Sequence, residues 1–310
     1  MLSYVEQNTA GSPTEPDVKW THLEAWSIAK YLEATHSLSV SCICIRRILK
    51  ANGYVKRKPL KAISTGQSPH KEVQFLMIAT FCRVFKVTKQ NPMLSIDTKK
   101  KEILGNLTRN KPIYQKKEKL VKVFDHDFPN LADDKAVPHG IYDIRLNKGF
   151  ITLGNSAETA DFIVDNLEHW WMNYGIHTYP DADNILIFSD GGGANGYRHY
   201  RYKQCLQALA KSIGIAITIV HYPPYCSKYN PIERMLFSQI HRTMGATLLI
   251  SLEQMKSIIE TTTTSANLSV IVRIVRKKYE HKLPSDPSLI DNDRIKYAKF
   301  LPQFNYTILP

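Results

Sequence analysis

The second half of the chain alternates short apolar runs with amphipathic patterns, and this alternation is what most constrains the fold. Apolar runs of strand length cover 93–96, 140–145, 150–154, 185–189 and 215–221. Helical periodicity over 159–174 and 197–213 separates the later runs, and a further helix is predicted from Pro231. Three strands without intervening helices, followed by alternating elements, predict a mixed sheet flanked by helices. The expected fold class is therefore α/β.

Before the predicted sheet, two shorter amphipathic patterns indicate a small all-α domain. Apolar residues recur at helical spacing over 21–35 and again over 40–52. Gly53 stands where a left-handed residue commonly ends a helix. Two helices joined by so short a break fit a helix-turn-helix over 20–54, and they fit an ordinary helical hairpin equally well.

The remaining boundaries follow from changes in composition. Residues 1–19 show no periodicity and are predicted to be a flexible lead. Residues 55–90 combine a basic segment containing proline and glycine with a connecting helix over 71–86. Residues 91–310 then form the large α/β domain.

Composition excludes several classes of protein. Hydrophobic residues make up 43% of the 310 residues, which is enough apolar surface for a folded core. The longest apolar run, 214–220, has the length of a strand, so we expect no membrane segment, and no signal peptide is recognised. The five cysteines are odd in number and form no C-x-x-C pair. This pattern argues against a disulfide framework and a zinc ribbon, and it favours a reducing compartment.

The net charge of +13 is concentrated in one segment. Residues 99–122 contain nine Lys or Arg and only two acidic residues. Such a run is typical of a solvated loop, but it is also typical of a surface that binds a polyanion. The charge run alone does not decide between them.

The segment SDGGGANG, at 189–196, follows a predicted strand and precedes a predicted helix. Its glycines match G-x-G-x-x-G, which raises the possibility of a dinucleotide-binding fold. That fold requires an acidic residue about 20 positions later to bind the ribose. None occurs over 191–232, the next strand ends in His221, and Asp190 places a negative charge at the mouth of the turn. The dinucleotide interpretation is therefore disfavoured.

Three acidic residues are candidates for a shared site. Asp97 and Asp190 each end an apolar strand, and Glu233 lies close to the start of the helix at Pro231. Each also has a structural alternative, because Asp190 could cap the following helix and Glu233 could complete a capping box with Asn230. Ligands of open α/β sheets bind at the carboxyl ends of the strands, where both aspartates are expected.

If the three carboxylates converge, a cation must offset their repulsion. Hard oxygen ligands without a Cys or His set suit Mg²⁺ or Mn²⁺. Two such ions can assist both the attacking and the leaving oxygen of a phosphoryl displacement. The basic run after Asp97 and the basic residues after Gly196 would flank this site, so the implied substrate is a nucleic acid.

Longer motifs occur in a specific order along the chain: SIDTKKKEILGN, HDFP, GIYD, SDGGGANGYR and PPYCSKYNPIERMLFS. Their combination resembles the insertion-sequence DDE transposases of the ISAzo type, and the PPY…NPIE segment is also similar to the mariner-like group. The resemblance runs from Trp20 to Ile308 and includes a terminal NYTI at 305–308.

The resemblance implies an RNase H-like catalytic domain over 91–310, with Asp97, Asp190 and Glu233 as an acidic triad that binds two Mg²⁺ or Mn²⁺ ions. It implies DNA at the element ends and at the target as substrates, and a homo-oligomer in the synaptic complex. The expected location is cytoplasmic and associated with the nucleoid. The residues expected to contact DNA are Arg46, Arg47, Lys99, Lys100, Lys101, Arg198 and Arg201.

Two differences from the family pattern leave other functions open. Members usually carry more chain before the segment that matches Trp20, and the variable positions of the second helix, usually polar, are here Cys42 and Ile43. Recognition helices normally present polar side chains to base edges. The alternatives are a repurposed, non-catalytic DNA-binding protein and an RNase H-like nuclease or resolvase that cuts without strand transfer.

Overall fold

The computed structural model describes residues 1–11, 19–57, 68–109, 114–126, 128–280 and 286–310. The chain forms two compact units, Met1–Ile63 and Ser64–Pro310. Residues 58–67 of the predicted linker lie outside the described residues. None of the described helices combines the length and the apolar character that a membrane span requires.

The N-terminal unit is built around α2 (Ala25–His36) and α3 (Cys42–Ala51). The prediction of a flexible lead over 1–19 is wrong for residues 1–11. These residues form α1 (Leu2–Gln7) and β1 (Thr9–Gly11), and β1 pairs with β2 (Lys19–Thr21) in an antiparallel ribbon. The reason is burial, because Val5 is fully buried against apolar side chains of α2 and α3. A single buried residue gives no periodic signal in the sequence.

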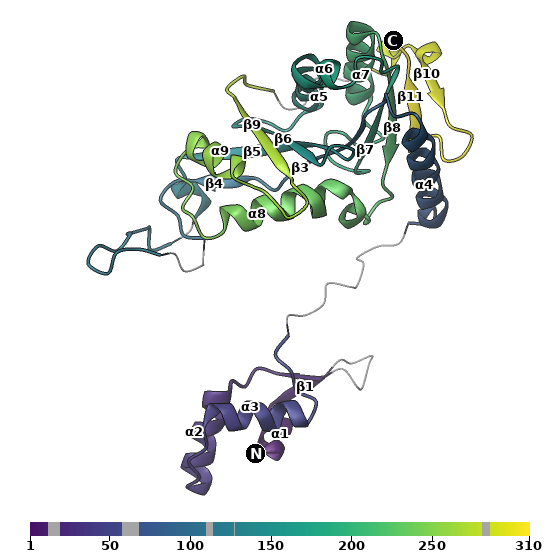
Figure 1. Cartoon of the computed structure of the whole chain (residues 1–310). Helices are drawn as coiled ribbons and strands as arrows, with labels where there is room; N and C mark the ends of the chain where they lie inside the picture. The colour runs from purple at the N-terminus through teal and green to yellow at the C-terminus, as the bar shows by residue number, and fades with distance from the viewer. Residues whose placement is uncertain (12–18, 58–67, 110–113, 127, 281–285) are drawn as a thin grey trace. The chain divides into compact units, whose positions relative to one another are not determined.

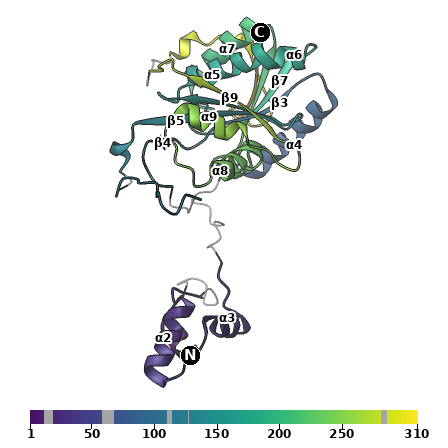
Figure 2. The same ribbon diagram turned by 60° about the vertical axis from the view of Figure 1, so that its left-hand side comes forward.

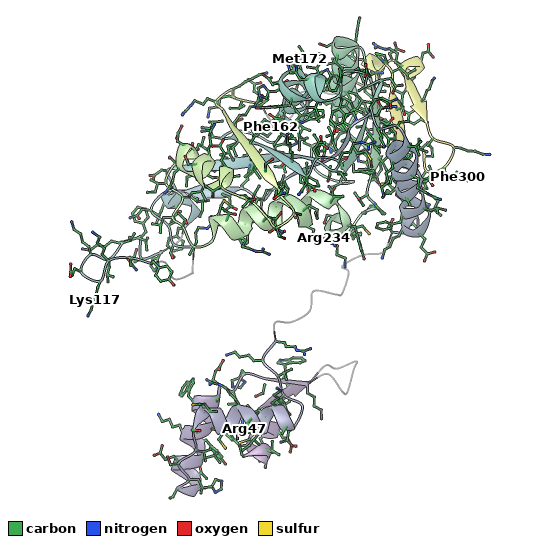
Figure 3. All side chains as sticks on the ribbon, in the orientation of Figure 1. Arg47, Lys117, Phe162, Met172, Arg234 and Phe300 are labelled. Atoms are coloured by element: carbon green, nitrogen blue, oxygen red, sulfur yellow. The ribbon has the colours of Figure 1, made fainter. Side chains whose placement is uncertain are left out.

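Helix α3 begins and ends where simple capping rules place its ends. The Ser41 hydroxyl accepts a hydrogen bond from the backbone N–H of Cys44, and Gly53 adopts the left-handed conformation with φ of +81°. Ile45 faces the core of the unit, whereas Arg46 and Arg47 are exposed. Figure 3 labels Arg47 on this helix.

The C-terminal unit contains a mixed sheet, which confirms the predicted α/β class. Within the described residues its nine strands run in the order β10-β11-β8-β7-β3-β5-β6-β9, and β4 pairs with β5 beside this path. The central strands β3, β7 and β8 are mutually parallel, while β5 is antiparallel to both β3 and β6. The strand bounds are β3 Met93–Thr98, β4 Glu102–Leu104, β5 Asp134–Asp143, β6 Lys148–Gly154, β7 Asn184–Ser189, β8 Ala216–His221, β9 Ser269–Val275, β10 Ile295–Tyr297 and β11 Asn305–Ile308.

Helices cover both faces of this sheet (Figures 1 and 2). Helices α5 (Ala160–Trp170) and α7 (Tyr200–Ile213) pack on one face, and α6 (Ile176–Thr178) follows α5 after a π-turn over Trp171–Gly175. Helices α8 (Ser238–Met244) and α9 (Leu252–Glu260) pack on the other face over β5, β6 and β9. Helix α4 (Lys71–Val87) packs on this same face over β3, β7 and β8. Short 3-10 turns cover Pro129–Leu131, Ser227–Tyr229, Pro287–Leu289 and Asn292–Arg294.

Some elements start earlier than predicted, and others were not predicted. Strand β5 begins at Asp134, whereas the prediction placed its start at residue 140. The segment 134–139 was missed because it contains Pro138, and prolines are normally excluded from central strands. Strand β9 and helix α9 were not predicted, although the sequence carries a signal for each. The alternating segment SVIVRIV marks β9, and Ser251 marks the start of α9 as its N-cap. The C-terminal strands β10 and β11 are only three and four residues long, and they form because β8 offers an edge.

One glycine allows the helical segment after Pro231 to lie close against the sheet. A Cβ atom at Gly140 on β5 would lie 2.7 Å from Phe237 Cε1 and 2.8 Å from Ile232 Cδ1. Gly140 stands directly opposite Asp97 in the ladder between β5 and β3. The absence of a side chain at this position therefore sets how near residues 232–237 approach β5, beside Asp97 on β3.

We expect Gly140→Ala to lower the free energy of unfolding by about 1–3 kcal/mol, as for other overpacked cores. The added methyl group must displace Ile232 and Phe237, both of which are buried. Urea unfolding followed by circular dichroism measures this change. The control is Gly192→Ala, where an added Cβ meets no heavy atom within 4 Å. Equal urea midpoints for the two variants would contradict the close approach.

Candidate active site

Asp97 and Asp190 are carried by neighbouring parallel strands. Asp97 is the fifth residue of β3, and Asp190 follows directly after β7. The two strands pair in parallel, with Ser95 opposite Phe188, so both aspartates lie toward the same edge of the sheet. Asp190 does not cap the next helix, because the residue at the N-cap of α7 is His199.

Glu233 lies in the segment that follows β8, and its charge reaches Asp97 at the same edge of the sheet. It is the first residue of a π-helical turn over Glu233–Phe237 that leads into α8. The predicted stripe of this segment is confirmed, since Ile232, Leu236 and Ile240 are all buried. Glu233 is only partly buried, and its carboxyl group hydrogen-bonds to that of Asp97.

The acidic neighbours raise the pKa of Asp97 and of Asp190. Burial, the charge of Asp190 and then Glu233 raise the pKa of Asp97 to about 8, against a single opposing hydrogen bond from the Thr98 N–H. Burial and the charge of Glu233 raise the pKa of Asp190 to about 6. Carboxylates that share a site in this way cannot all ionise without help from a positive charge. The structure thus brings the three predicted residues into one electrostatic cluster.

A buried polar network links the segments that carry these acids. The Asn230 amide donates to the Ile96 carbonyl oxygen at 3.2 Å and to Asp190 Oδ1 at 3.5 Å. Ser95 Oγ donates to Asn230 Oδ1 at 2.5 Å and accepts from the backbone N–H of Ile232 at 3.0 Å. Ser95 and Asn230 are completely buried. Asn230 does stand directly before the helical segment that begins at Pro231, as predicted, but its side-chain oxygen accepts from Ser95 across the sheet edge rather than from the first helical turn.

A second network fixes the backbone of Asp190. His221 Nδ1 lies 2.9 Å from the Asp190 carbonyl oxygen and 3.0 Å from Ser189 Oγ, and its Nε2 lies 3.3 Å from the Tyr306 hydroxyl. Burial lowers the pKa of His221 to about 4, which keeps the ring neutral near pH 7. Neither network was predicted in these terms, since both depend on contacts between residues more than 30 positions apart.

The basic residues predicted to bind DNA fall into two groups. Lys99 forms an ion pair with Glu102, which also pairs with Arg109 at 2.9 Å. Arg201 makes a two-point contact with Asp161, at 2.5 and 3.1 Å. The charges of Lys99 and Arg201 are thus already matched by carboxylates, a pairing that spacing along the chain does not reveal.

The other predicted basic residues present their charges to solvent. Lys100 and Lys101 are exposed immediately after β3. Arg198 stacks over the ring of Tyr197, with its guanidinium carbon 5.1 Å from the ring centre. The later part of the basic run lies on a loop that extends away from β4, with Lys117 labelled on it in Figure 3. Residues 110–113 of that run lie outside the described residues.

The acidic cluster has the chemistry of a site for a hard cation. Among the described residues, no group of three or more Asp, Glu, His or Cys side chains is placed so that it could hold a metal ion. Magnesium usually takes one or two protein carboxylates and fills its other positions with water and phosphate oxygens. Two carboxylates at adjacent strand ends, such as those of Asp97 and Asp190, are enough for a site of that kind.

The order β6-β5-β3-β7-β8, with acids at the ends of β3 and β7, defines an RNase H-like domain preceded by a small helical unit. A family model described as the Rhodopirellula transposase DDE domain matches residues 1–310. The chain belongs to this family of DDE transposases, and the predicted resemblance is confirmed. A search of curated proteins finds no match.

Solved structures of a mariner transposase are similar to the chain. The pre-cleavage Mos1 transpososome is 12% identical with a TM-score of 0.47, and the match covers 76% of this chain and 65% of that one. The Mos1 paired-end complex with the left transposon end is 12% identical with a TM-score of 0.44, covering 79% and 74%. The chain therefore spans about two thirds of the length of the first of these transposases.

We expect Asp97→Asn to stabilise the metal-free protein at alkaline pH. A folded-state pKa of about 8, against 3.8 for the ordinary side chain, means that the wild type loses stability as pH rises from 4 to 8. The neutral amide escapes this loss, so the variant should melt several degrees higher at pH 8 and the gap should narrow at pH 5. Each kcal/mol corresponds to about 2–4 °C in a domain of this size.

Thermal denaturation in EDTA at the two pH values measures the effect. Adding Mg²⁺ at pH 8 should then raise the melting temperature of the wild type more than that of Asp97→Asn, because the variant lacks one ligand. A variant that melts below the wild type at pH 8 in EDTA would show that the carboxylates do not repel one another.

Proposed function

We propose that this protein is the DNA transposase of an insertion sequence. It hydrolyses a phosphodiester at the ends of the element and joins the resulting 3′ hydroxyl to target DNA. The observation that carries the proposal is the cluster of Asp97, Asp190 and Glu233, three carboxylates from separate elements that raise the pKa of two of their members. Membership of a DDE transposase family supports it independently.

In this proposal the three carboxylates hold two Mg²⁺ or Mn²⁺ ions. When bound, such ions activate the attacking oxygen and stabilise the leaving oxygen of an in-line phosphoryl displacement. Asp97 interacts with the charges of both other acids, and in this proposal it is the shared ligand. Asn230 and His221 keep Asp190 in place by bonding to its side chain and its backbone, so the ligands need little rearrangement on binding.

The proposed DNA contacts near the site are Lys100, Lys101 and Arg198, whose charges are available to phosphates. Lys99 and Arg201 are left out of this set, because Glu102 and Asp161 already neutralise them. In the N-terminal unit, α2 and α3 act as a helix-turn-helix that presents Arg46 and Arg47 to the element ends. A pair of such proteins would hold two ends in one synaptic complex, in the cytoplasm and associated with the nucleoid.

Asp190→Asn should abolish strand cleavage while DNA binding is retained. The amide keeps the size of the side chain but loses the charge that holds a hard cation, so the single-turnover rate should fall by several orders of magnitude. Cleavage of the element-end DNA in Mg²⁺, and again in Mn²⁺, measures the rate. A gel shift on the same preparation measures binding.

The matched control for this test is Asp293→Asn, a carboxylate exposed in the turn at Asn292–Arg294. It should cleave like the wild type. Equal rates for Asp190→Asn and the wild type refute the role of Asp190. If neither protein cleaves and both bind the element ends specifically, the protein is a repurposed DNA-binding protein.

The double variant Lys100→Ala/Lys101→Ala should weaken binding to all DNA sequences alike. Each lost phosphate contact should reduce the slope of log affinity against log salt by about 0.9, so the expected reduction is up to about 1.8. Titrations at four salt concentrations measure it. The charge-matched control is Lys256→Ala/Lys277→Ala, whose ammonium groups pair with Glu260 and Asp165. An equal slope in both double variants contradicts the proposed contacts.

A further inference from the structure

A small cavity lies between helix α5 and the end of the sheet formed by β6 and the edge strand β9. Its volume is about 20 Å³, which is room for one atom of about the size of a water oxygen. Apolar and aromatic side chains form most of its wall, and Asn166, Trp170 and Arg273 bring side-chain nitrogens to it. Among the described residues, none of those that line it is an Asp or a Glu.

The fold brings these three side chains together from two elements. Asn166 and Trp170 stand four positions apart on α5, so they share one face of the helix, and each is only 2% exposed. Arg273 stands on β9 opposite Thr152 of β6, which also lines the cavity. Arg273 Nη2 donates to Asn166 Oδ1 at 2.9 Å. This bond fixes the orientation of the amide and leaves its NH₂ group to find another acceptor.

Three N–H groups at the cavity are buried and have no hydrogen-bond partner within the part of the chain that the structure describes. They belong to Asn166 Nδ2, Trp170 Nε1 and Arg273 Nε. All three can only donate. Leaving a buried donor unpaired is costly, and so many around one cavity is unusual for a folded protein. An acceptor inside the cavity would remove the cost for all three.

The cavity also carries an unmatched positive charge. None of the ion pairs among the described residues includes Arg273, and burial lowers its pKa. Asp165 acts on Arg273 electrostatically, but its carboxylate already accepts from Lys277 Nζ at 2.6 Å and from the Tyr279 hydroxyl at 2.9 Å. Burial and then the charge of Arg273 lower the pKa of His139 to about 3, so this charge is felt in the interior.

We propose that the cavity binds a single halide ion, chloride under ordinary conditions, between the N–H groups of Asn166, Trp170 and Arg273. A water molecule accepts only two hydrogen bonds, needs acceptors for its own hydrogens and brings no charge. A sulfate ion or a DNA phosphodiester has five heavy atoms and exceeds the volume of the cavity. The ion therefore has no part in holding DNA, and it joins α5 to the edge strand β9.

Urea unfolding of the full chain in sodium chloride and in sodium gluconate, at one ionic strength, tests this inference. Gluconate is too large for the cavity, and equal ionic strength keeps general screening constant. Because chloride binds only the folded protein, each tenfold rise in its concentration above the dissociation constant should shift the folding equilibrium about tenfold. Circular dichroism follows the unfolding of the C-terminal unit. Equal midpoints in the two salts overturn the inference and leave water as the occupant.

Trp170→Phe removes one N–H group and keeps an aromatic ring of similar shape. It should bind chloride about tenfold more weakly, because hydrogen bonds to a charged acceptor are among the stronger ones. The matched control is Trp171→Phe, a buried tryptophan that does not line the cavity. It should keep the chloride dependence of the wild type. The same dependence in both variants places the chloride effect elsewhere and overturns the site.

Asn166→Asp supplies a built-in substitute for the ion. The carboxylate has the size of the amide, accepts the bond from Arg273 and matches its charge. We expect the urea midpoint of this variant to be independent of chloride and, in gluconate, to lie above that of the wild type. A variant that keeps the full chloride dependence contradicts the proposed position of the ion.

Bromide gives a direct view of the site, since it replaces chloride and scatters X-rays anomalously. Crystals of the wild type grown in sodium bromide should show an anomalous peak within hydrogen-bond distance of Trp170 Nε1, and crystals of Asn166→Asp should not. A wild-type map without this peak overturns the site. Cleavage of element-end DNA bears on none of these measurements, so the halide site and the transposase proposal stand or fall separately.

Discussion

Repulsion among Asp97, Asp190 and Glu233 is the constraint to which the rest of the C-terminal unit responds. Burial and like charge raise the pKa of Asp97 to about 8, so the cluster opposes its own ionisation near neutral pH. Without restraint, rotation of the side chains or separation of the strands would relieve it. The parallel pairing of β3 with β7 and the buried bonds of Ser95 and Asn230 prevent both responses.

The stability that offsets this cost comes from the two packed faces of the sheet. Apolar side chains of α5 and α7 fill one face, and those of α8 and α9 fill the other. The second core also contains Ile232 and Leu236, which flank Glu233, so the packing that stabilises the fold also delivers the third carboxylate. Gly140 is part of the same arrangement, because it leaves room for Ile232 and Phe237 opposite Asp97.

The sequence was informative where a property is local. The ends of two apolar strands located Asp97 and Asp190, and the buried stripe at Ile232 and Leu236 located the segment of Glu233. It was uninformative where a partner is distant. The pairing of Arg201 with Asp161 joins residues 40 positions apart, and the bond from Ser95 to Asn230 spans 135. For the same reason the position of Asn230 before Pro231 was predictable, whereas the distant partner of its side chain was not.

The glycine loop shows how one local pattern can serve two unrelated folds. In a dinucleotide site its glycines would let a pyrophosphate approach the backbone. Here a Cβ at Gly191 would lie 3.0 Å from the Tyr222 carbonyl oxygen, so the missing side chain lets the loop turn against β8's continuation. That turn leaves Asp190 at the sheet edge and places Arg198 on the surface, with its guanidinium over the Tyr197 ring. The glycines thus let one short loop present a carboxylate at the sheet edge and, a few residues later, an exposed guanidinium.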